Sequence, residues 1–178
     1  GISSGIITLL AKNIIMQEFY EGATIPLKET VQKINDRFIY EKGPIDNYIT
    51  GILLRCEGGK IELVNFGHQR PLLYKSKTKS LSFVENTPES FGAIGISSFP
   101  SVFDSISLEM ESGDELVLYT DGIVDCENEI KEAFGYERLT DVFRKSAGFT
   151  AEEQLELLYH TLEAFTGEVE PEDDKTIV

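Results

Sequence analysis

The chain has 178 residues, of which 41% are hydrophobic and 26% charged, and this length and composition suit one soluble domain with its own core. Its 16 basic residues against 31 acidic ones give a formal net charge of −15, which argues against binding to the phosphate backbone of a nucleic acid. No apolar run approaches the roughly 20 residues of a membrane-spanning helix. We therefore expect a single cytoplasmic domain that contacts neither nucleic acid nor a membrane.

Two amphipathic helices are predicted at the beginning of the chain. Apolar residues recur at near-helical spacing over residues 2–20, which predicts one long helix. Thr24 and Pro26 are typical of a helix start, so a second helix is predicted over residues 27–41, and a Gly-Pro pair ends it. The predicted apolar stripes are Ile2, Ile6, Leu9, Leu10, Ile14, Met16 and Phe19 in the first helix, and Leu27, Val31, Ile34 and Phe38 in the second.

Short strands are predicted next. Residues 48–54 are rich in β-branched and aromatic side chains, and a Gly-Gly pair separates them from a second apolar run at 61–64, so the two runs predict a hairpin. Further strands are predicted at 72–74 and 81–84, and another near 102–108 after a loop that contains several glycines and prolines. Consecutive short strands are typical of an antiparallel sheet.

An acidic turn follows the next predicted strand. In the segment Gly113–Asp125, the apolar run Leu116–Tyr119 predicts a buried strand, and the Asp121-Gly122 pair then predicts a reversal of the backbone. Asp125 comes four residues later, so a second carboxylate could return to the same place, and two carboxylates at a strand end suit a hard cation. The alternative is a plain hairpin turn that binds no metal, because Asp-Gly is the commonest hairpin signal. On the turn alone, this alternative is the stronger one.

The C-terminal part predicts two helices and a second acidic segment. The helices are expected around residues 139–143 and over 151–165. Beyond them, the pair Asp173-Asp174 stands directly before residues 175–178, which resemble the start of a strand. If that strand lies beside the one before the acidic turn, the carboxylates meet and form a site that suits Mg²⁺ or Mn²⁺. The alternative is a solvated surface, which is the usual role of an acidic tail.

Neither the histidines nor the cysteines form a recognisable site. Cys56 and Cys126 are far apart in the sequence, and two cysteines fit reduced thiols better than a disulfide framework. His160 lies among leucines on a predicted helix, where a solvent-facing or locally bonded side chain is expected. His68 lies in a predicted hairpin turn; it could act as a general acid, but a structural hydrogen bond is the stronger interpretation.

Four segments, in this order, resemble the motifs of a known family. Asn65–Leu73 is similar to its Asn-Ala-Gly-His-x-x-Pro-Leu hairpin, and Gly113–Asp125 is similar to its Gly-Asp-x-Leu-x-Leu-Tyr-Thr-Asp-Gly-x-x-Glu segment. Phe134–Leu139 is similar to its Phe-Gly-x-x-Arg-Leu element, and Asp173–Thr176 to its closing Asp-Asp-x-Thr. The family is the SpoIIE-type bacterial branch of the PPM metal-dependent serine/threonine phosphatases, and the resemblance extends over nearly the whole chain.

The resemblance implies an α+β fold, an αββα sandwich in which two antiparallel sheets flanked by helices hold a metal centre at one edge. Matched position by position, Asp121 and Asp173 correspond to metal-binding aspartates. Asp125 corresponds to a more weakly held outer metal position, and Asp174 to a neighbour of the ligands. The intact site would hold two Mn²⁺ or Mg²⁺ ions that activate a shared water, so no side chain is expected to act as the nucleophile.

One family motif has no counterpart in the chain. Family members carry, before the first long helix, an Asp-x-x-Gly-His-Gly segment whose aspartate bridges the two metals, and a further acidic residue on an earlier strand. Gly1 would correspond to the last glycine of that segment. We therefore expect residues 1–178 to be a single, N-terminally truncated phosphatase domain with an incomplete and inactive metal centre. Loss of two strands would expose sheet edges, which favours a homodimer.

The function that the resemblance implies is that of a bacterial signalling phosphatase. Its substrate would be a phosphorylated anti-sigma-factor antagonist, and an upstream sensor or regulatory domain would control it through the two N-terminal helices. Two alternatives stay open at this stage. One is a degenerate, non-catalytic interaction module that binds a regulator, and the other is a purely structural sandwich whose acidic turns bind no ion.

Overall fold

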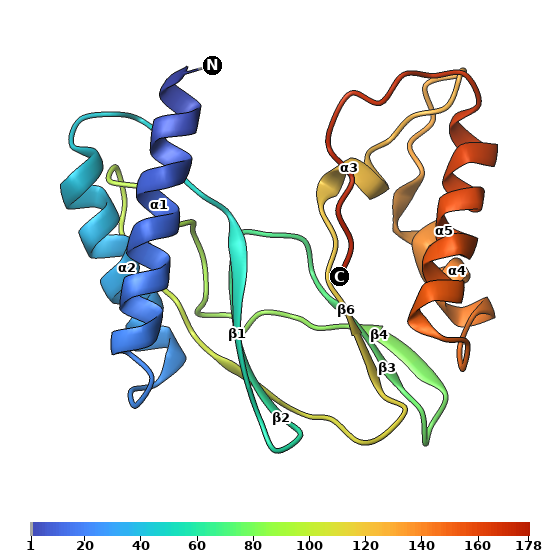
Figure 1. Cartoon of the computed structure of the whole chain (residues 1–178), viewed down its shortest axis with the longest axis horizontal. Helices are drawn as coiled ribbons and strands as arrows, with labels where there is room; N and C mark the ends of the chain where they lie inside the picture. The colour runs from blue at the N-terminus through green and yellow to red at the C-terminus, as the bar shows by residue number, and fades with distance from the viewer. Residues whose placement is uncertain (1) are drawn as a thin grey trace. The chain divides into compact units, whose positions relative to one another are not determined.

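The computed structural model describes residues 2–178, with side chains from Gly5 onward. The chain divides into two compact units. Unit 1 extends to His68 and includes Asn86–Met110, and unit 2 comprises Gln69–Glu85 and Glu111–Val178. Each unit holds one three-stranded antiparallel sheet with its own helices (Figure 1). Among the described residues, no helix is both long and apolar enough to cross a bilayer.

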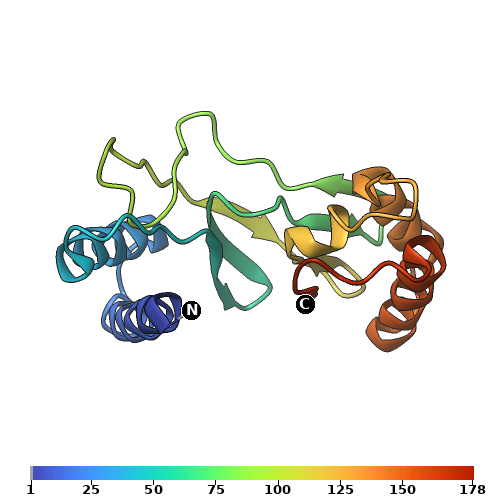
Figure 2. The same cartoon turned by 90° about the horizontal axis from the view of Figure 1, so that it is seen from above.

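Unit 1 contains two helices and a sheet with the strand order β1-β2-β5. The bounds of its elements are Ile2–Glu21 (α1), Leu27–Lys42 (α2), Gly51–Glu57 (β1), Lys60–Phe66 (β2) and Ile106–Glu109 (β5). Gly51 pairs with Phe66 and Leu63 pairs with Ile106, so both pairs of strands are antiparallel, as predicted. Figure 2 shows α1 and α2 side by side. A core that includes the buried Phe38 joins these helices to the sheet.

The buried face of α1 differs from the prediction. Ile7 and Ile14 are buried, and only the second of these was expected. The helix carries apolar residues on nearly every side, so their spacing does not select one face, and packing in the unit 1 core decides it. The stripe predicted for α2 is confirmed, since all four of its residues are buried. Gly1 and the side chain of Ile2 lie outside the described part, so expectations about them stay predictions. The α1 residues wrongly predicted as buried are Ile6 (61% exposed), Leu9 (62%) and Met16 (49%).

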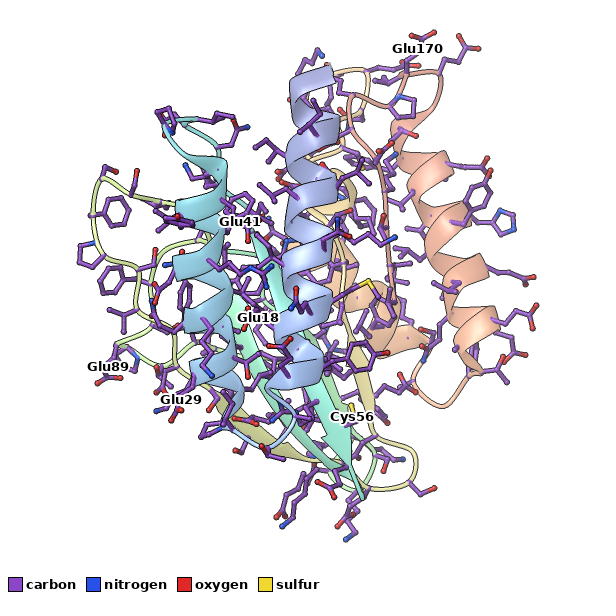
Figure 3. The ribbon with its side chains drawn as sticks, turned by 60° about the vertical axis from the view of Figure 1, so that its left-hand side comes forward. Glu18, Glu29, Glu41, Cys56, Glu89 and Glu170 are labelled. Carbon is purple, nitrogen blue, oxygen red and sulfur yellow. The ribbon has the colours of Figure 1, made fainter. Side chains whose placement is uncertain are left out.

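Arg37 joins the two helices of unit 1. Its guanidinium lies 2.9 Å from a carboxylate oxygen of Glu18 on α1 and 2.6 Å from one of Glu41 on α2. Both glutamates are labelled in Figure 3, on neighbouring helices. Such half-exposed ion pairs stabilise a fold only modestly, so the apolar core contributes more to the association of α1 with α2.

Unit 2 contains the second sheet, with the order β4-β3-β6, and three helices. The bounds are Leu72–Lys75 (β3), Ser80–Phe83 (β4), Glu115–Val117 (β6), Asp121–Val124 (α3), Gly135–Lys145 (α4) and Ala151–Thr166 (α5). β3 pairs antiparallel with both of its neighbours. α5 begins with a capping box, in which Thr150 and Glu153 each accept the other's backbone N–H through a side-chain oxygen. A core that includes the buried Phe134 and Leu139 joins helices and sheet.

The acidic turn after β6 is helical, so the alternative of a plain hairpin turn is wrong. Asp121 is the first residue of α3, and the N–H of Asp125 donates to the carbonyl oxygen of Asp121 at 2.8 Å. The chain does not fold back beside its own strand, because another segment already pairs there: Tyr119 forms an antiparallel bridge with Ile177. The strand before Asp121 therefore ends where the sequence indicated, and long-range pairing decided that a helical turn follows it.

Asp114, expected only as part of a turn, is an anchoring carboxylate of unit 2. Its side chain is 3% exposed and lies 2.7 Å from the ammonium group of Lys75 on β3. It also accepts the backbone N–H of Ser76 at 2.8 Å and that of Glu111 at 3.0 Å. The ammonium group of Lys75 and these N–H donors hold the pKa of Asp114 well below its usual range. This carboxylate therefore ties the turn before β6 to the β3–β4 hairpin.

Replacing Asp114 by Asn is expected to lower the urea midpoint at neutral pH, because Lys75 then loses its carboxylate partner. The folded pKa of Asp114 lies below the unfolded value of about 3.9, so its stabilisation is fully present above that pH and declines as the pH falls further. The gap in stability between wild type and variant should therefore narrow as the pH falls from about 4 to about 2. Urea titrations across this range measure it, with Asp141→Asn, a surface carboxylate, as the control; a gap that does not change with pH would contradict the prediction.

Candidate metal centre

The C-terminal residues pair with the segment that leads from β6 to Asp121. Leu118 and Val178 exchange backbone hydrogen bonds of 2.8 and 2.9 Å, and the N–H of Thr120 donates to the carbonyl oxygen of Thr176 at 3.0 Å. Figures 1 and 2 both show the C-terminal segment beside the segment that enters α3. The predicted strand start at residues 175–178 is thus placed next to the acidic turn, as the sequence suggested.

Two small residues hold this pairing tightly at the turn. The hydroxyl of Thr120 donates to the carbonyl oxygen of Asp174 at 3.1 Å and accepts the N–H of Thr176 at 2.9 Å. A Cβ atom on Gly122 would lie 2.5 Å from the carbonyl oxygen of Asp174, closer than real Cβ atoms approach other atoms. Glycine is therefore required at position 122 for the backbone of Asp173 and Asp174 to lie against the start of α3.

All three predicted ligand residues are exposed at this junction. Asp125 and Asp173 line one cleft of about 130 Å³, which has Gly122 in its wall. Asp121 precedes Gly122, and one of its carboxylate oxygens accepts the N–H of Gly122 at 3.0 Å. The carboxylate of Asp173 accepts the N–H of Asp174 at 2.8 Å. The structure therefore brings Asp125 and Asp173 to one cleft and leaves Asp121 beside it.

The donor chemistry of this cleft fits a hard divalent cation. Carboxylate oxygens suit Mg²⁺ and Mn²⁺, and Mg²⁺ keeps several waters while binding through one or two protein carboxylates. Asp125 and Asp173 supply two such carboxylates. In the part of the chain that the structure describes, no three histidine, cysteine or acidic side chains stand close enough to form a ligand group. The predicted third ligand, Asp121, is thus next to the cleft and not gathered with the other two.

Five of the six charged residues in the wall of the cleft are acidic, which favours the approach of cations. Glu170, labelled in Figure 3, lies on the turn that follows α5. Of the charged wall residues, sequence reasoning singled out Asp125 and Asp173 and missed the others, which meet them only when the turn after α5 folds against the segment after α3. The charged residues of the wall are Asp125, Glu127, Glu170, Glu172, Asp173 and Lys175.

The cysteines and histidines lie in surroundings that can be described one by one. Both cysteines are free thiols. Cys126 lies in the wall of the cleft, where burial raises the pKa of its thiol, and it donates to the carbonyl oxygen of Ile123 at 3.2 Å. His160 is solvent-facing, as predicted. The backbone of His68 is held by Asn65, whose side chain accepts its N–H and donates to its carbonyl oxygen.

A protein-family model described as Stage II sporulation protein E (SpoIIE) matches residues 1–178. The chain belongs to the SpoIIE family. This is a family of PP2C-type serine/threonine phosphatases that are in general metal-dependent, so the resemblance drawn from the four motifs is confirmed. Protein IcfG of Synechocystis sp. is 27% identical over 128 residues, which cover 70% of this chain and 19% of IcfG. The chain thus spans about a fifth of the length of that relative.

Solved structures with the same fold include three bacterial domains. The SiaA-PP2C domain of Pseudomonas aeruginosa has a TM-score of 0.82 at 19% identity, over 99% of this chain and 69% of that one. The structure of the RsbU and RsbW domains of a Mycobacterium tuberculosis protein has a TM-score of 0.68 at 22% identity, and the match covers 99% of this chain and 47% of that one. The phosphatase domain of SpoIIE from Bacillus subtilis has a TM-score of 0.56 at 18% identity, and the match covers 97% of this chain and 71% of that one. These SpoIIE-type neighbours confirm the predicted fold class, with two antiparallel sheets and flanking helices.

Proposed function

We propose that this SpoIIE-family domain hydrolyses phosphoserine or phosphothreonine on a protein, with Mn²⁺ or Mg²⁺. The observation that carries the proposal is the antiparallel pairing of residues 118–120 with 176–178. This pairing puts Asp173 into one cleft with Asp125 and sets Asp121 beside it. Support also comes from the family match over residues 1–178.

In this proposal Asp125 and Asp173 hold the metal, and Asp121 completes the set of ligands. When bound, Mn²⁺ or Mg²⁺ would make a water easier to deprotonate, so that hydroxide is available as the nucleophile, and would supply positive charge for the phosphoryl oxygens. The protein's own contribution is positioning: Thr120 and Gly122 fix the backbone that presents the aspartates. The protonated thiol of Cys126 takes no part.

The proposed substrate is a phosphorylated anti-sigma-factor antagonist in a cytoplasmic signalling pathway, under the control of an upstream regulatory domain. Among the similar structures, one pairs RsbU and RsbW domains, and another holds the PP2C domain of SpoIIE with a fragment of its regulatory domain. We also propose that residues 1–178 form a homodimer through their sheet edges. Light scattering tests this dimer, and a monomer in solution would contradict it.

Phosphate release from a phosphoserine protein by the full-length protein tests the activity. With Mn²⁺ present we expect turnover, and EDTA should abolish it because the carboxylates cannot bind phosphate without a cation. No release at any Mn²⁺ concentration would contradict the proposal and favour the alternative, a non-catalytic module that binds a regulator.

A further inference from the structure

A second hollow of unit 2 adjoins the cleft of the candidate metal centre. This hollow, of about 620 Å³, lies between α5 and the C-terminal segment, and we name it the α5 groove. The groove and the cleft share four wall residues, so the two hollows adjoin at a common wall. The shared residues are Thr166, Val169, Pro171 and Lys175.

The α5 groove has an apolar floor and an apolar rim. Leu158 and Ile123 are each 2% exposed and belong to the core, so they form its floor. On the rim, Leu155 is 44% exposed and Tyr159 is 58% exposed. These two residues are four positions apart on α5 and therefore lie on the same side of the helix. The capping box at Thr150 fixes the start of α5, so the rim is presented by an ordered helix.

The composition of the groove contrasts with that of the cleft. Glu163 and Lys175 are its only charged lining residues in the described part of the chain, whereas acidic side chains dominate the cleft. A small phosphate ester that reached the metal would fill only the cleft. A protein chain whose phosphorylated side chain entered the cleft would continue across the shared wall and over the groove. Apolar contacts of this kind, next to the reacting group, give specificity between substrates.

We propose that the α5 groove docks an apolar segment of the phosphoprotein substrate, adjacent to its phosphorylated residue. The inference rests on the proposed function and names the feature by which the enzyme distinguishes a protein from a simple phosphate ester. The wall that groove and cleft share carries it, because a docking site serves catalysis only where it holds the substrate beside the reacting groups.

The test uses the full-length protein with Mn²⁺ and two probes: para-nitrophenyl phosphate and a serine-phosphorylated anti-sigma-factor antagonist. Leu155→Asp and Tyr159→Asp should each raise the KM for the phosphoprotein by about tenfold or more, as loss of an apolar anchor does. Their kcat/KM for para-nitrophenyl phosphate should equal that of wild type. Phe149→Asp is the matched control, since Phe149 is an apolar side chain, 51% exposed, just before α5 and outside the groove.

Three outcomes would overturn the inference. The first is an unchanged phosphoprotein KM in both groove variants, and the second is an equal rise in the Phe149→Asp control. The third is a change from dimer to monomer in Leu155→Asp without a change in KM, which would assign the groove to a second copy of the chain. Wild-type protein that hydrolyses neither probe would instead refute the proposed function, so the two failures are distinguishable.

Discussion

Asp173→Asn is expected to reduce phosphate release by roughly three orders of magnitude, since the metal ion supplies several kcal/mol of charge stabilisation and each 1.36 kcal/mol is tenfold in rate. The amide keeps the shape of the carboxylate and loses its negative charge, so the cleft that it shares with Asp125 binds a cation more weakly. Assays of full-length protein over a range of Mn²⁺ concentrations measure the effect. Calorimetric titration of Mn²⁺ gives a second readout that is independent of turnover.

Neighbouring carboxylates provide graded controls for this substitution. Asp174→Asn changes the adjacent residue. Thr120 and Gly122 contact the backbone of Asp174 and not its side chain, so we expect phosphate release to fall by about tenfold at most. Asp141→Asn on α4 should leave both readouts unchanged, because that carboxylate pairs with Arg144 at the surface. Equal activity of Asp173→Asn and Asp141→Asn would refute the assignment of Asp173 as a ligand.

Local sequence signals predicted most helices and strands. The buried face of α1 and the form of the turn at Asp121-Gly122 depended on long-range packing. The glycine turn at residues 58–59 and the apolar runs around it give the β1–β2 hairpin directly, because adjacent segments pair by themselves. The face of α1 could not be predicted, since an all-round apolar helix has no preferred side until α2 and the sheet pack on it. The Asp121-Gly122 pair became helical because residues 176–178 occupy the neighbouring strand position.

The candidate site follows the same division. The sequence predicted that the segments bearing Asp121 and Asp173 lie side by side, and residues 118–120 do pair with 176–178, although Asp121 stays beside the cleft that holds Asp173. The helical turn α3 decides which carboxylates line the cleft. It brings Asp125 to the same cleft as Asp173, whereas Asp121 stays at the start of α3. The α5 groove has no sequence signature, because its lining combines residues from α3, α5 and the C-terminal segment.

Gly122→Ala is expected to lower both stability and activity, although alanine is normally favoured over glycine in a helix. Alanine is favoured over glycine inside a helix by about 1 kcal/mol, so local propensity alone predicts a more stable protein. The added Cβ would meet the carbonyl oxygen of Asp174 at 2.5 Å, and a backbone atom cannot move aside without shifting the C-terminal segment. Overpacking of this kind typically costs about 1–3 kcal/mol, so the clash should outweigh the propensity.

The displaced segment carries Asp173, so phosphate release should fall further than the stability loss explains, and Mn²⁺ should bind more weakly. Urea unfolding and Mn²⁺ titration of the same protein separate the two effects. Gly5→Ala is the matched control, because an added Cβ on Gly5 in α1 would meet no described atom within 4 Å beyond its chain neighbours and the backbone of its own helix, and alanine there should raise stability or leave it unchanged. A Gly122→Ala protein that is more stable than wild type and fully active would show that the C-terminal segment does not press against α3. In that case the backbone support that we infer for the position of Asp173 in the cleft would be absent.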